Sequence, residues 1–176
     1  MLFENQIHET YKVLGLTAMC SMGGEHKIAW AMRLLEQDIE SEAVAILAGI
    51  SNPINEFEVD EYFIKALSDL SIERPPYAEA LWGYTKAVAT EVINGVQSPD
   101  EGVSLIYEIY ICLNYPDQLS AFTELNDEWL CECIMGWSSD QRRAEIIKAC
   151  DEVIHRTEYP RLSYKTESSE RGERGT

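Results

Sequence analysis

Apolar residues recur at helical spacing along nearly the whole chain, and no stretch sustains the alternation of a strand. The segment EVDEYFIKALSDL places apolar side chains at i, i+4, i+7, i+8 and i+11 from Val59. Only SLIYEIYICLNY, which is rich in β-branched and aromatic residues, competes as a strand. It follows Ser98, Pro99 and two acids, which together form a helix start signal. The sequence therefore predicts an all-α fold.

Caps and helix breakers divide the chain into about eight helices within one domain, residues 1–159. At 176 residues the chain has the length of about one domain. Residues 160–176 form a polar, Gly-rich tail without apolar periodicity, which we expect to be disordered. The predicted helices span residues 3–21, 25–37, 40–48, 56–70, 76–94, 99–114, 116–134 and 139–157.

Two stretches 46 residues apart, ILAGISNPINE and VINGVQSPDEG, carry a glycine and a proline at the same spacing. At this offset Gly49 aligns with Gly95 and Pro53 with Pro99, and the apolar positions on either side recur in register. We interpret each stretch as a helix closed by a left-handed glycine, a short turn and a proline-led helix. The offset lies in the range of HEAT and armadillo repeats, so stacked antiparallel helical hairpins are expected. The alternative is a coincidence, because glycine and proline are common at the ends and starts of helices in general.

Acidic residues dominate the charge and lie in long segments that contain no base. The net charge is −17, and residues 1–159 alone carry −18 because the tail has four bases and three acids. Eight acids lie between Leu34 and Ile64 and ten between Ala87 and Gln141, with no Lys or Arg in either segment. Such a body repels nucleic-acid phosphates and anionic membranes, so neither is expected as a partner. It attracts basic proteins, although acidity also serves solubility alone.

Targeting and cysteine patterns point to the cytoplasm. The first residues, MLFENQIHETYKV, include acids and no apolar signal core, and the apolar runs are too short to span a membrane. Five cysteines at irregular spacing predict no disulfide framework. Four of them lie among apolar neighbours in predicted helices, where free cysteine usually behaves as a small buried hydrophobe.

Catalytic and metal-binding patterns are weak. None of the three histidines lies in a recognisable motif, and the two cysteines of CEC point to different sides of a helix. MGGEHK does not match a phosphate-binding loop, and Glu128 and Glu132 have no Glu-x-x-His partners for a di-metal site. We therefore predict a protein without cofactor or metal that is not an enzyme.

Two acidic helices that also carry aromatic residues are the predicted contact surface. Interfaces commonly place aromatic anchors among charged residues. In the alternative interpretation, the aromatic residues belong to the core and the acids form only the hydrated face. We also expect the acidic turns near residues 56–61 and 100–101 to share one face. The predicted contacts are Glu56, Phe57, Asp60, Glu61, Glu124, Asp127, Glu128 and Trp129.

The succession LAGISNP, FEVDEYFIKAL, VINGVQSPDEG and LSAFTELNDEW resembles a group of small, all-helical bacterial proteins without an assigned activity. The resemblance covers roughly residues 26–157. It implies a helical fold in a bacterial cytoplasm and transfers no catalytic residue.

These observations favour a binding protein that docks or neutralises a basic protein, in the manner of an immunity protein and its nuclease toxin. The alternative is a small helical adaptor that holds a peptide in a groove between hairpins. An enzyme is the least favoured class.

Overall fold

The computed structural model describes residues 4–19, 23–131 and 136–156, and among these the side chains of 8–19, 23–127 and 136–156. This part of the chain is all-α, with eight α-helices and no strand, as predicted. The tail predicted over 160–176 lies outside it. The helices are α1 (Glu4–Ala18), α2 (Gly24–Glu36), α3 (Glu42–Gly49), α4 (Glu56–Asp69), α5 (Tyr77–Ile93), α6 (Pro99–Cys112), α7 (Ala121–Cys131) and α8 (Ser139–His155), with the 3-10 helix η1 (Asp117–Leu119) before α7.

Among the described residues, four of the eight α-helices begin with a serine or asparagine whose side chain caps the first turn. Ser98 accepts a hydrogen bond from the backbone N–H of Glu101, and Pro99 is the first residue of α6. Ser138 and Gln141 form a complete capping box at the start of α8. The seventh helix differs, because Pro116 leads into η1 and α7 begins only at Ala121.

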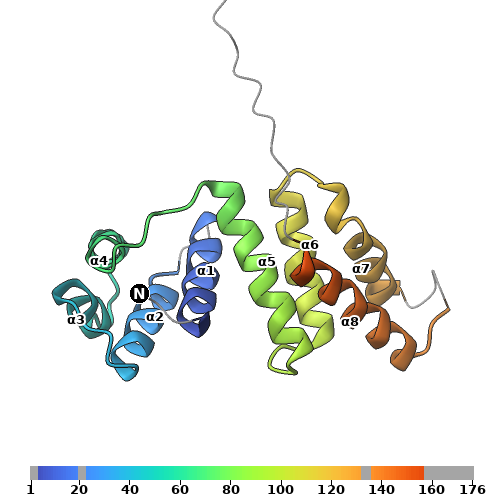
Figure 1. The fold of residues 1–176 in the computed structure, drawn as a ribbon, viewed down its shortest axis with the longest axis horizontal. Coiled ribbons are helices and arrows are strands. Elements are labelled where there is room, and N and C mark those ends of the chain that lie inside the picture. The colour runs from blue at the N-terminus through green and yellow to red at the C-terminus, as the bar shows by residue number, and fades with distance from the viewer. Residues whose placement is uncertain (1–3, 20–22, 132–135, 157–176) are drawn as a thin grey trace, which may run out of the picture.

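The helices form two halves that meet at α1 and α5 (Figure 1). In this view α3 and α4 lie at one end of the molecule and α6, α7 and α8 at the other. The N-terminal core, built by α1–α4 with one residue of α5, includes Val13, Trp30, Leu34, Val44, Leu47, Val59, Phe63 and Ala80. The C-terminal core, built by α5–α8 and η1, includes Leu81, Tyr84, Val88, Ile106, Ile109, Leu119, Phe122, Ile146 and Cys150.

The contact between α1 and α5 is close because each helix offers a glycine to a tyrosine of the other. A Cβ added at Gly15 of α1 would overlap the side chain of Tyr84, and one added at Gly83 of α5 would overlap the ring of Tyr11. Both positions therefore exclude a larger residue while the helices keep this separation.

The expected repeat of the glycine and proline turn is correct in its second copy and wrong in its first. Gly95 has a left-handed φ of 71° after α5, and Pro99 leads α6. Gly49, in contrast, is the last helical residue of α3, which the chain leaves through the extended Ile50. Pro53 lies in the following turn, and α4 begins at Glu56 with Asn55 as its N-cap.

Burial shows why the apolar register is only partly shared. In the second helix of each pair, Phe63 and Ile109 are both buried, as are Leu67 and Leu113. In the first helix the offset of 46 pairs exposed residues with buried ones, Ile46 with Val92 and Leu47 with Ile93. The core-facing sides of α3 and α5 are thus displaced by one residue, so the two hairpins are not copies of one packing unit.

Candidate functional site

The acids predicted on α4 are mostly bound within the protein. Glu56 accepts hydrogen bonds from the backbone N–H of Gly24 at 3.0 Å (Oε2) and 3.3 Å (Oε1). Gly24 is the first residue of α2, where unpaired N–H groups and the helix dipole favour a carboxylate. Glu56 therefore stabilises the start of α2 from the neighbouring helix.

The next two acids of α4 pair with lysines. Asp60 forms an ion pair with Lys27 of α2, whose side chain is buried and also lies over the ring of Phe63. Glu61 pairs with Lys65 one turn later, with 2.6 Å between Oε1 and Nζ. Three of the four residues predicted on this helix thus take part in intramolecular contacts.

Phe57 is the exception on α4. Its side chain is 88% exposed, which excludes the alternative that it belongs to the core. Ile64, seven residues later and therefore on the same side of the helix, is also exposed. This position leaves Phe57 accessible to a partner.

The acids predicted on α7 are less involved in intramolecular contacts than those on α4, among the side chains that the structure describes. Glu124 is exposed and Asp127 half-buried. Phe122, in the same helix, belongs to the C-terminal core. Glu128 and Trp129 are helical, but their side chains lie outside the described residues.

The structure does not bring the two predicted acidic segments together. Helix α4 lies at one end of the molecule and α7 at the other (Figure 1). The start of α6, which we expected to share a face with α4, belongs to the C-terminal half. There Asp100 lies 3.5 Å from Arg142, and Glu101 accepts hydrogen bonds from Ser98 and Gln97.

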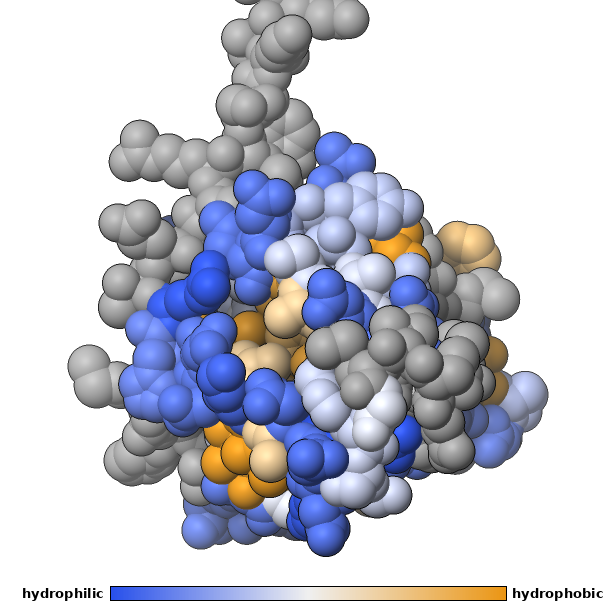
Figure 2. All heavy atoms as spheres, turned by 90° about the vertical axis from the view of Figure 1, so that its right-hand side faces the viewer, coloured by the Kyte–Doolittle hydropathy of each residue, from blue (hydrophilic) through white to orange (hydrophobic). Residues whose placement is uncertain are grey.

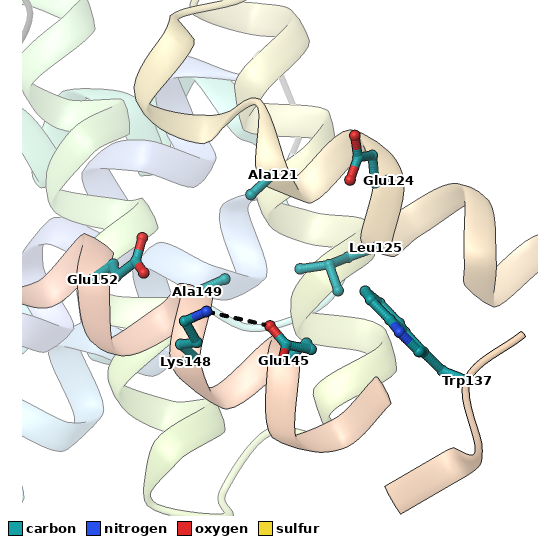
Figure 3. A pocket seen from close by; sticks show the side chains of 8 residues that line it. All are labelled: Ala121, Glu124, Leu125, Trp137, Glu145, Lys148, Ala149 and Glu152. Atoms are coloured by element: carbon teal, nitrogen blue, oxygen red, sulfur yellow. Dashed lines mark ion pairs between the residues drawn. The ribbon is translucent and has the colours of Figure 1, made fainter. Parts of the chain in front are cut away.

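A hollow of about 130 Å³ between α7 and α8 combines acidic and apolar residues. Figure 2 shows this end of the molecule, where hydrophilic side chains surround apolar ones. In Figure 3, Glu124 of α7 and Glu152 of α8 lie on opposite sides of the hollow, with Leu125 and Ala149 between them. The lining consists of Ala121, Glu124, Leu125, Trp137, Glu145, Lys148, Ala149 and Glu152.

The hollow carries an excess of two negative charges, from three glutamates and one lysine. Lys148 lies 3.6 Å from Glu145, an exposed pair within one helix. Neither Glu124 nor Glu152 has an ion-pair partner among the residues that the structure describes. Of the residues that line the hollow, the sequence predicts Glu124 as a contact but not Trp137 or Glu152, because their proximity depends on how α8 packs on α7. The one local signal for Trp137 is its position directly before Ser138, the N-cap of α8.

A second charged group lies between α1, α2 and α5. The ligand atoms of His8, Glu9 and Glu91 are within 4.8 Å of one another, which could hold a metal ion. Two cations of the protein already contact these carboxylates, however. Lys12 lies 2.7 Å from Glu91, which is only 8% exposed, and Arg33 lies 2.9 Å from Glu9. The arrangement neutralises its own charge and serves the contact between the halves.

The cysteines with described side chains differ in burial. Cys150 is fully buried in the C-terminal core, and this burial raises the pKa of its thiol to about 12, which disfavours the reactive thiolate. Cys112, in contrast, is exposed at the end of α6 and does not behave as a buried hydrophobe. The side chains of Cys20, Cys131 and Cys133 lie outside the described residues.

Comparison with protein-family models, curated proteins and solved structures gave no match to this chain. The resemblance to small helical bacterial proteins therefore stays a prediction. None of the described helices is long and apolar enough to cross a membrane.

Proposed function

We propose that this chain is an acidic, non-enzymatic binding protein of the bacterial cytoplasm that docks or neutralises a basic protein. The observation that carries the proposal is the unneutralised negative charge of one long segment in the C-terminal half. From Ala87 to Gln141, a segment that includes α6 and α7, ten acids occur without a lysine or arginine. Such a surface suits an immunity protein, which would cover the cationic cleft of a nuclease toxin.

The physical basis is long-range attraction between opposite charges. A surface of one sign steers a partner of the other sign during diffusion and raises the association rate constant. Salt screens exposed charges over about 8 Å at physiological ionic strength, so this rate constant falls as salt rises. We place the contact on Glu124 and Asp127 and on the neighbouring Glu128 and Trp129, ahead of the α4 acids.

The experiment is capture of partners from the source cell at low and at high salt, followed by mass spectrometry. We expect a basic protein that is retained at low salt and released at high salt. Its association rate constant should fall on charge reversal of Glu124 and Asp127. An acidic partner, or binding that is unchanged by charge reversal at all the predicted acids, would contradict the proposal.

A helical adaptor that binds a peptide is the second candidate function. The observation in its favour is the partly apolar hollow between α7 and α8. In that case affinity would depend weakly on salt and strongly on Leu125 and Trp137. Measuring the dissociation constant of the captured partner across a salt series separates the two functions.

A further inference from the structure

We propose that the hollow between α7 and α8 holds one long basic side chain, a lysine or arginine, of the partner protein. The side-chain stem would lie on Leu125 and Trp137, and the cation between Glu124 and Glu152. This inference rests on the proposed function and assigns it a specific binding position.

The size of the hollow selects a single side chain. Small-molecule and cofactor sites usually enclose about 300–1,000 Å³. The hollow measures about 130 Å³ and opens to solvent between two helices. It is thus too small for a cofactor and suited to one extended side chain that enters from outside.

The charges around the hollow select a cation. Glu145 already has Lys148 at 3.6 Å, whereas Glu124 and Glu152 have no ion-pair partner within the described part of the chain. They approach the hollow from different helices, so a cation between them would be attracted by both carboxylates (Figure 3). A partner's carboxylate would be repelled by them.

The apolar lining of the hollow favours a cation that is carried on an apolar chain, as in lysine and arginine. Leu125 is buried and Trp137 half-buried, and both line the hollow, with Trp137 on the side of Leu125 that faces away from Glu152 (Figure 3). Lysine and arginine cover apolar surface with their methylene groups while the charged end stays hydrated, and arginine also stacks on tryptophan. A bare metal ion gains nothing from this lining, whereas a basic side chain uses both parts of the hollow.

The test is isothermal titration at low ionic strength with short peptides of lysine and of ornithine. Ornithine has the same charge and one methylene fewer, so it should bind up to about fourfold more weakly. In the double variant Glu124→Gln/Glu152→Gln, lysine-peptide affinity should fall by about tenfold, and the difference between the two peptides should shrink. The matched control is Glu42→Gln/Glu58→Gln, which removes two exposed acids from α3 and α4 and should have a much smaller effect.

Three outcomes would overturn the inference. They are equal affinity for the two peptides, equal weakening by the two double variants, and no binding of the lysine peptide to the unsubstituted protein. None of these decides the proposed function, which depends on the captured partner and its response to salt. Conversely, an acidic captured partner would end the proposed function even if the hollow bound lysine peptides.

Discussion

The N-terminal and C-terminal halves each contain four helices and a buried core, but their acidic residues make different contacts. On α4, Glu56 binds the start of α2, and Asp60 and Glu61 bind lysines. At the α7–α8 hollow, Glu124 and Glu152 have no ion-pair partner among the described residues. Acidic residues that look equivalent in the sequence thus differ in role: Glu56 and Asp60 of α4 stabilise the fold, whereas Glu124 and Glu152 at the hollow remain available to a partner.

The largest expected effect concerns the contact that joins the halves. Gly83→Ala places a methyl group against the ring of Tyr11 and should lower the free energy of unfolding by about 3 kcal/mol. Urea unfolding followed by circular dichroism measures the change. Gly49→Ala is the matched control, because a Cβ there meets no neighbour and a helical alanine should stabilise by a few tenths of a kcal/mol. Equal stability of the two variants would mean that the halves are not held by close packing of α1 on α5.

The second effect is alkaline destabilisation of the C-terminal half. Burial, with the charges of Glu91 and Glu108, raises the pKa of Tyr84 from 10.0 to about 12, and burial raises the pKa of Cys150 from 9.0 to about 12. Both groups stay protonated in the folded protein while the unfolded chain ionises. The stability that these two groups contribute is therefore fully present below their pKa values in the unfolded chain, and it is lost as the pH rises toward 12.

Between about pH 8 and about pH 10, these two groups should lower the free energy of unfolding by about 2 kcal/mol, mostly through Cys150. Urea unfolding at both pH values, in the protein and in Tyr84→Phe/Cys150→Ala, measures their share. The variant should lose less stability across this range. An identical loss in both proteins would show that neither group is responsible.

The third prediction separates structural from available acids. Asp60→Asn leaves the buried Lys27 without its carboxylate and should destabilise by about 1.5 kcal/mol, less than for a fully buried pair because Asp60 is partly exposed. Glu124→Gln should change stability by less than about 0.5 kcal/mol. Chemical denaturation of both variants checks the contrast, and comparable destabilisation would remove the distinction between the α4 acids and those of the hollow.

The smallest expected effect is that of Phe57→Ser. Because the side chain is 88% exposed, stability should change by less than about 0.5 kcal/mol. Affinity for the captured partner should also stay constant if the contact lies at the C-terminal half. A clear loss of affinity in a stably folded Phe57→Ser protein would mean that α4 contacts the partner.

The helices could be predicted because their signals are local. Ser98, Pro99 and Ser138 determine helix starts through neighbours a few residues away. The roles of the α4 acids could not be predicted in this way, because Glu56 and Asp60 bind groups 32 and 33 residues earlier in the chain. The hollow likewise depends on the packing of α8 on α7, which brings Glu152 opposite Glu124. The composition shows that the chain is acidic, but it does not show which acidic side chains lack an intramolecular partner.

The position of α1 against α5 also imposes an order on biosynthesis. Lys12 contacts Glu91, which follows it by 79 residues, and Ala80 of α5 completes the N-terminal core. When α4 has left the ribosome, the side of α1 around Tyr11 and Gly15 still has no neighbour. The first half of the molecule therefore matures only after α5 has been translated, and until then this strip of α1 is open to chaperones or to a second nascent chain.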